Sequence, residues 1–215
     1  MLAGRAADAI NAFAFDVYEH LQREQGNLFF SPLSIATALA MTYAGAAGDT
    51  AAQFEDVLHL GSEPGIHESF QQLLSSLNAQ SSPGGPQLEA ANAIWPAQEL
   101  PVRQSFVDVV EGNYDGYVQT VDYSSPSAAE AIINDWVADH THQKILDLVQ
   151  DLSPATAMVL TNALYFKGSW ENQFKPEFTG NGFFTRSDGS IVAAPLMHTM
   201  VYPDIAVTGL GEFTV

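Results

Sequence analysis

The spacing of apolar positions predicts two helices near the start of the chain. Between Ile10 and Leu21, apolar residues recur at i, i+3, i+4 and i+7, as expected for a helix with one buried stripe. Residues 33–43 are apolar nearly all round, which predicts a helix that is buried on every side. Ser31 is suited to cap this helix, because its hydroxyl can accept a bond from a free backbone N–H of the first turn. Pro32 fits the first helical position, where no N–H is needed.

Two more helices are expected before the first strong loop. Residues 50–53 have the sequence of a capping box, which predicts a third helix that ends at Gly61. A fourth helix places four large apolar residues on one face: Phe70, Leu73, Leu74 and Leu77. Residues 81–86 are rich in Ser, Pro and Gly, which predicts a loop.

After this loop the pattern alternates between strands and helices. Strands are predicted over 87–95 and 116–121, and a helix from Pro101 lies between them. A second capping box at 127–130 opens a further helix.

The run 157–166 is apolar on both faces, which predicts a central strand covered above and below. Short strands are expected from residue 178 onward, with turns at 187–189 and 202–204. Helices first, and then strands among helices, indicate an α+β fold with a large sheet.

Three long motifs resemble the serpin family of serine protease inhibitors. Residues 27–53 are similar to the serpin helix B to helix C region, and residues 133–149 to helix F and its exit. Residues 160–171 are similar to the strand 3A signature. Long motifs in the right order are far more specific than one short pattern.

The resemblance implies a serpin fold in which N-terminal helices pack on a large, mainly antiparallel sheet A. Residues 1–215 would form a single incomplete domain: helices A–F, part of sheet A and the start of the sheet C region. The reactive-centre loop would lie outside this chain. In an intact serpin this loop is cleaved by the target protease and inserts into the sheet as an extra strand.

The resemblance also places seven residues in named regions of the serpin fold. The shutter under the sheet would contain Ser31, Ser34 and Asn162, and the breach at its top would contain Trp170. Helix F, lying over sheet A, would contribute Asn134, Trp136 and Val137.

Asn162 also stands out without the resemblance, because it is an amide in the middle of an apolar strand. An unpaired buried amide costs about 1–3 kcal/mol, so partners are expected, and Ser31 and Ser34 are candidates. The chemistry of these residues alone fits two interpretations. One is a polar latch that holds the sheet closed; the other is an ordinary N-cap at Ser31 and a satisfied core amide at Asn162.

The sequence does not suggest an enzyme, a cofactor or a metal site. Ser31 has no histidine base in its segment, so it is not expected to be a nucleophile. His140 and His142 are close in sequence, but a spacing of two points them to different faces of a helix. The chain has no cysteine, which excludes disulfides and thiolate chemistry.

Charge narrows the partners further, because 25 Asp and Glu outnumber 7 Lys and Arg and give a net charge of −18. Nucleic acid and anionic membranes are therefore poor partners. Residues 66–80, which correspond to serpin helix D, contain no Lys or Arg, so polyanion activation there is not expected. The acid excess indicates a solvated surface or an adaptation to high salt. In the second case the melting temperature would rise in molar KCl.

Two functions are expected of the intact protein. One is inhibition of serine proteases, with cysteine proteases as a second target class; the other is a non-inhibitory binding or structural role. The chain alone is expected to be inactive and to aggregate through exposed strand edges. The localisation stays open, because family resemblance favours an extracellular protein and the absence of a signal peptide favours the cytoplasm.

Overall fold

The computed structural model describes residues 2–198 apart from positions 25, 62, 63, 80–84, 86, 171 and 187. The chain divides into two compact units, Met1–Lys167 and Gly168–Val215, which are described separately. The turn expected at 202–204 and most of the loop expected at 81–86 lie outside the described residues.

The first unit contains six helices and three strands among its described residues. In chain order they are α1 (Leu2–Leu21), α2 (Pro32–Tyr43), α3 (Asp49–Val57), α4 (Ile66–Asn78), β1 (Gln87–Pro96), α5 (Gln104–Tyr114), β2 (Tyr117–Val118), α6 (Pro126–His140) and β3 (Met158–Lys167). The expected helices are all present, although α3 ends at Val57, before the expected Gly61. The strands expected over 87–95, 116–121 and 157–166 are present, but a short strand that the apolar run Leu28–Phe30 predicts is not formed. The predicted α+β class is confirmed.

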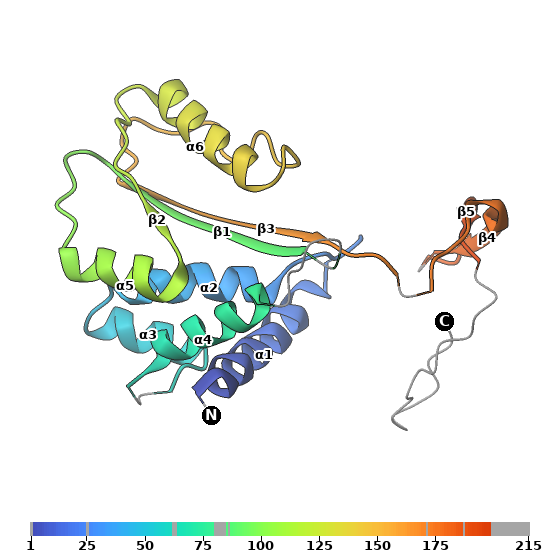
Figure 1. The fold of residues 1–215 in the computed structure, drawn as a ribbon, viewed down its shortest axis with the longest axis horizontal. Helices are drawn as coiled ribbons and strands as arrows, with labels where there is room; N and C mark the ends of the chain where they lie inside the picture. The colour runs from blue at the N-terminus through green and yellow to red at the C-terminus, as the bar shows by residue number, and fades with distance from the viewer. Residues whose placement is uncertain are drawn as a thin grey trace. The chain divides into compact units, whose positions relative to one another are not determined.

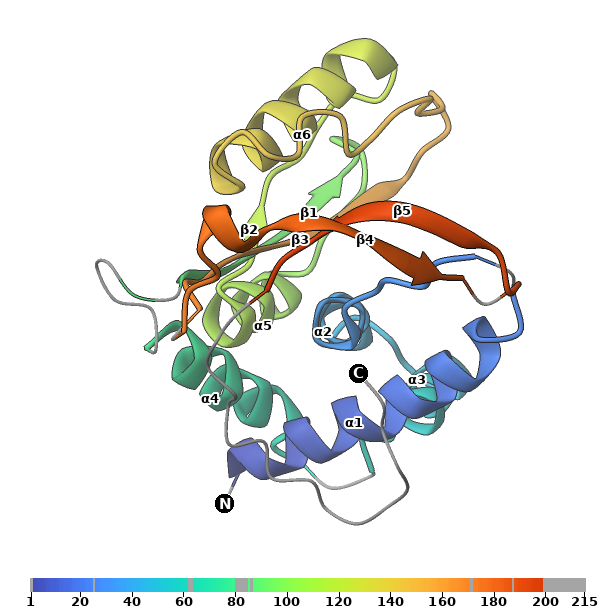
Figure 2. The same ribbon diagram turned by 90° about the vertical axis from the view of Figure 1, so that its right-hand side faces the viewer.

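The three strands form a mixed sheet in the order β2-β1-β3. β1 pairs antiparallel with β3 along its whole length and parallel with the short β2. Helices α1 to α5 lie on one side of this sheet, and α6 lies alone on the other (Figure 1 and Figure 2). The sheet is therefore the middle layer of three.

Apolar side chains fill both gaps between the layers. The larger core joins the first five helices to the sheet and includes Phe13, Met41, Phe70, Ile94 and Tyr114. The smaller cores lie under α6 and include Trp95, Ile133 and Val137.

Burial in the helices and strands differs from expectation in two places. α2 is not buried on every side, because Ile35 is 37% exposed where no described element covers it. β3 is also less covered than expected. It pairs only with β1 among the described residues, and its pattern alternates between buried and half-exposed positions before ending exposed at Phe166 and Lys167.

Both expected capping boxes are wrong. α3 begins after Gly48, whose φ of 59° places it in the left-handed region, and no side chain caps it. α6 begins after Ser125, with Pro126 in its first turn and no side-chain cap. Glu130, the expected capping acid, instead accepts a hydrogen bond from the backbone N–H of Leu152 at 2.7 Å.

The second unit contains a short 3₁₀ turn and a hairpin among its described residues. The turn is η1 (Pro176–Phe178), and the strands are β4 (Gly180–Thr185) and β5 (Ile191–Leu196). The two strands pair antiparallel, as the pattern of the tail predicted. The expected turn at 187–189 lies between them, where Gly189 has a φ of 81° and Ser190 N–H donates to Asp188 Oδ1.

Candidate functional site

A pair of asparagines joins the two long strands at the middle of the sheet. Asn92 of β1 lies directly opposite Asn162 of β3 in the antiparallel register. Asn162 Nδ2 donates a hydrogen bond to Asn92 Oδ1. Asn92 Nδ2 donates in turn to the backbone carbonyl of Tyr114, at 3.2 Å, at the end of α5. The polar pair therefore links β3 to β1 and β1 to the helical layer.

The two serines expected beside Asn162 lie at the start of α2, a helix that packs against β3. Ser31 is the N-cap as predicted, and its Oγ accepts from Ser34 N–H at 3.3 Å. Ser34 Oγ and Thr37 Oγ1 are buried and have no hydrogen-bond partner within the described part of the chain. The partner of Asn162 is Asn92 rather than either serine.

Asn92 is the site residue that the sequence reasoning missed. It is 2% exposed and lies in a strand whose last six residues are all buried. An amide in the middle of a short apolar strand was a usable signal, because a buried amide needs partners. Its partner could not be named without the β1–β3 register.

The phenol of Tyr114 extends the contacts of this network to α4. Tyr114 is buried, and burial raises the pKa of its phenol, which therefore keeps its proton. The phenol can donate to Nδ1 of His67, 2.6 Å away. Burial lowers the pKa of His67, against the opposing attraction of Glu68, so the neutral ring is favoured.

α6 covers the other face of the sheet, and its contacts with the strands include Trp136 and Val137. Val137 is fully buried against Ala91 of β1 and Ala163 of β3. The Trp136 ring stacks on Tyr117 at 5.6 Å and meets Trp95 edge-on at the same distance. One helix thus contacts all three strands through aromatic and aliphatic packing.

Asn134 fixes the segment that leaves α6. Its Oδ1 accepts from Val149 N–H at 2.9 Å, and its Nδ2 donates to the Val149 carbonyl at 2.8 Å. Together with the bond from Leu152 to Glu130, this amide holds the exit segment against its own helix. The prediction gave Asn134 no separate role, and the structure shows it to be a clamp on residue 149.

Trp170, expected at the breach, belongs to the second unit. It is 68% exposed, and its ring contacts Phe174 edge-on at 5.5 Å. Its breach position stays a prediction, because the two units are described separately.

The described residues include neither a cluster of metal-ligating side chains nor a membrane-spanning helix. They contain no group of three His, Cys, Asp or Glu side chains placed to hold a metal ion. The helices of the same residues include none that is long and apolar enough to cross a bilayer.

A helical layer, a mixed sheet and a single covering helix define an α+β protein with a polar pair at the centre of its sheet. The serpin (serine protease inhibitor) family model matches residues 8–209, which includes both units. The chain belongs to the serpin family.

Curated relatives come from archaea and mammals. A serpin-like protein of Thermococcus kodakarensis is 40% identical over 194 residues, which cover 89% of this chain and 45% of the relative. Alpha-1-antiproteinase 2 of Equus caballus is 35% identical over 199 residues, covering 90% of this chain and 47% of the relative. The chain therefore spans about half the length of the curated relatives it matches.

Solved serpin structures share the fold. Lamprey angiotensinogen with a cleaved reaction loop matches with a TM-score of 0.84 and 31% identity, over 93% of this chain and 59% of that chain. The native stressed conformation of an Arabidopsis serpin matches with a TM-score of 0.81 and 28% identity, over 93% of this chain and 52% of the other. The predicted family and fold class are confirmed.

Proposed function

We propose that the intact protein containing this chain inhibits serine proteases by a trapping mechanism, in which a cleaved reactive loop enters the sheet. Cysteine proteases form a second target class. The chain described above supplies the scaffold, and the bait lies in a part of the protein outside it. Relatives named as antiproteinases support this function.

The observation that carries the proposal is the match of the serpin (serine protease inhibitor) family model to residues 8–209, which include the whole sheet. The strand β3 belongs to the sheet that would receive the cleaved loop. One edge of this strand is fully paired with β1, and the other has no partner strand among the described residues. Unpaired N–H and C=O groups along a strand edge accept an added strand. β3 is ten residues long, which is enough for an extended ladder.

The site residues have distinct parts in this proposal. Asn162 and Asn92 hold the paired side of β3, while Ser31 and Ser34 form the start of the helix beneath it. Trp136 and Val137 hold α6 over the face that must shift or yield when a strand is added, and Asn134 holds the exit segment of that helix. Trp170 is proposed to lie at the top of the sheet, where insertion starts.

The test mixes the longest natural polypeptide that contains this chain with trypsin-like, chymotrypsin-like, subtilisin-like and papain-like proteases. The expected result is a complex with one of them that survives SDS. Cleavage of the protein by all four without such a complex would reject trapping for these classes and favour a binding or structural role. A parallel sample of residues 1–215 alone is expected to form no complex.

A further inference from the structure

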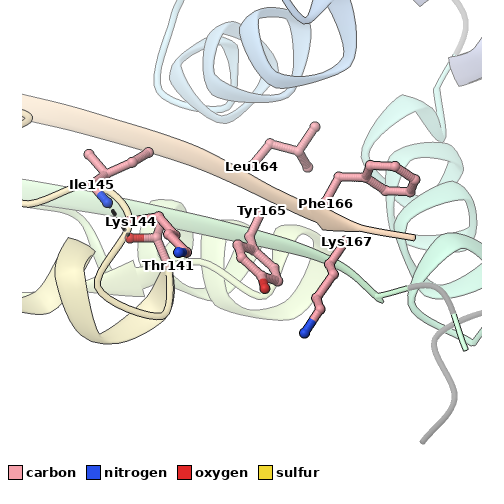
Figure 3. Close-up of a pocket in the computed structure, with 7 residues that line it drawn as sticks. All are labelled: Thr141, Lys144, Ile145, Leu164, Tyr165, Phe166 and Lys167. Carbon is pink, nitrogen blue, oxygen red and sulfur yellow. Dashed lines mark hydrogen bonds between the residues drawn. The ribbon is translucent and has the colours of Figure 1, made fainter. Parts of the chain in front are cut away.

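A pocket of about 460 Å³ lies between the exit of α6 and the end of β3, at the point shown in Figure 3. Seven residues line it: Thr141, Lys144, Ile145, Leu164, Tyr165, Phe166 and Lys167. Two of them are lysines, in a chain with only 7 Lys and Arg against 25 Asp and Glu. No carboxylate is among the residues that line it.

The two lysines approach the pocket from different elements. Tyr165 and Lys167 are two positions apart on β3 and therefore project to the same face, the one on which Thr141 and Lys144 lie, with the Tyr165 ring between the two lysines (Figure 3). Leu164 and Phe166 project to the opposite face. Neither lysine forms an ion pair with any described residue, and the Tyr165 hydroxyl likewise has no hydrogen bond within the described chain.

The backbone that bears Lys144 is held firmly. Thr141 is 1% exposed, and its Oγ1 donates to the Val137 carbonyl and accepts from Ile145 N–H at 3.2 Å. His142 and Gln143 have φ values of 51° and 59°, an unusual conformation for side-chain-bearing residues. Lys144 N–H closes the turn on the Thr141 carbonyl at 3.0 Å.

A second anchor ties this turn to the strands. His142 Nε2 lies 3.1 Å from Glu89 Oε2 on β1, and the His142 ring contacts Tyr165 at 4.5 Å. Glu89 is the register partner of Tyr165, so the histidine bridges both strands. The Glu89 carboxylate is thus paired with His142, and it forms no ion pair with a lysine among the described residues.

We propose that this pocket binds a small polyvalent oxyanion of the phosphate or sulfate class through Lys144 and Lys167, with the Tyr165 hydroxyl as a further donor. Ammonium groups bind phosphate as mobile point charges with several donors. The net charge of −18 opposes anions at long range. At 0.1 M salt, however, charges more than about 10 Å away are largely screened, so the two nearby lysines determine whether an anion binds.

The pocket beside the opposite edge of β1 supplies a contrast. It has a volume of about 390 Å³ and is lined by three carboxylates, Glu89, Asp115 and Asp139. A third pocket, between α1 and the end of α3, is lined by Asp16 and Asp56 together with two histidines, His20 and His59, and His59 is paired with Asp16. The lysine pocket is therefore the place among these three where an anion is favoured.

An anion bound there contacts both the α6 exit segment and β3. It therefore adds a link between the covering helix and the sheet, whether or not the protein inhibits a protease. Two measurements follow: affinity for the anion, and hydrogen-exchange protection of residues 141–149, which should increase when the anion is bound.

The test measures binding of inorganic phosphate by calorimetry to the longest natural polypeptide that contains this chain, at constant ionic strength set with chloride. Lys144→Gln and Lys167→Gln are each expected to weaken binding about tenfold, because a charge-assisted contact is lost. Lys144→Arg, which keeps the charge, is expected to retain most of the affinity for phosphate. Arg103→Gln is the matched control, since Arg103 is an exposed base away from the pocket.

Saturable binding that is lost in both glutamine variants and kept in the Arg103 variant supports the site. Absence of saturable binding, or equal weakening in all three variants, overturns it. Exchange protection by phosphate that is spread over the whole chain, rather than confined to 141–149 and the end of β3, also contradicts it.

Discussion

β1 and β3 are paired along their whole length, yet they differ in how deeply they are buried. The last six residues of β1 are all buried, whereas only Thr161 and Ala163 of β3 are buried and the strand ends exposed. By sequence, β3 is the more continuously apolar strand, with Met158–Lys167 containing Leu, Tyr and Phe at its end. The difference shows that a strand's burial depends on the elements beside it and not on its own hydrophobicity.

The clearest way to test this difference uses two residues opposite each other in the register, Ile94 and Leu160. Ile94 is 0% exposed and Leu160 is 36% exposed. Ile94→Ala is expected to lower the free energy of unfolding by about 2–5 kcal/mol, because it leaves a cavity in the core. Leu160→Ala should cost about 1 kcal/mol or less, since much of its side chain already meets water. Urea denaturation of both variants measures the two losses.

Equal losses for the two variants would show that β3 is as well covered as β1. The same pair can be measured in a longer natural polypeptide that contains this chain. If that protein places a further strand beside β3, Leu160 becomes buried there and the gap between the variants narrows. An unchanged gap would count against strand addition at this edge.

The asparagine pair provides a second comparison of β1 and β3, in which the expected losses of unfolding free energy are smaller. Asn92→Ala removes the acceptor of Asn162 and the donor to the Tyr114 carbonyl, so it leaves two groups unsatisfied. It is expected to cost about 1–3 kcal/mol, and Asn162→Ala, which frees one acceptor, should cost about 1 kcal/mol. The double variant is expected to cost less than the sum, because both partners are then gone.

Thermal or urea unfolding of the three variants measures these costs. Asn78→Ala is a suitable control, because Asn78 is an exposed asparagine at the end of α4 and should change stability little. Strict additivity of the Asn92 and Asn162 substitutions would contradict an energetic link between them. A larger loss of unfolding free energy for Asn162→Ala than for Asn92→Ala would contradict the expectation that the β1 residue matters more.

Local patterns predicted most of the helices and strands. The features that they did not predict depend on contacts between residues far apart in the sequence. The apolar run 157–166 matched β3 to within one residue at each end. The capping box at 127–130 failed because Glu130 bonds Leu152 N–H, a contact from a loop 22 residues away. Ser31 was correctly predicted as an N-cap, because that bond spans only three residues.

The centre of the site was only half predictable for the same reason. Asn162 was conspicuous in its strand, but its hydrogen bond reaches a residue 70 positions earlier in the chain. Similarly, the pocket at Lys144 and Lys167 forms only when the exit of α6 turns back onto β3. Neither pairing has a signal in local spacing, because both depend on register and on where a helix lies over a sheet.

The smallest expected effect concerns the pH dependence of the contact between His67 of α4 and Tyr114 of α5. His67 has a lowered pKa in the folded chain because of burial, while its unfolded pKa is near the usual value of about 6.5. The unfolded state therefore binds more protons between these two values, so stability should rise with pH through this window and be lost as pH falls below about 6.5. The titratable groups around the ring are Glu68 on the same helix, Tyr114, and Tyr43, whose hydroxyl is bonded to Glu55. His67→Gln is expected to flatten the dependence of the unfolding free energy on pH between 5 and 7 relative to the unsubstituted chain. Parallel curves for the two proteins would show that folding does not lower the pKa of His67.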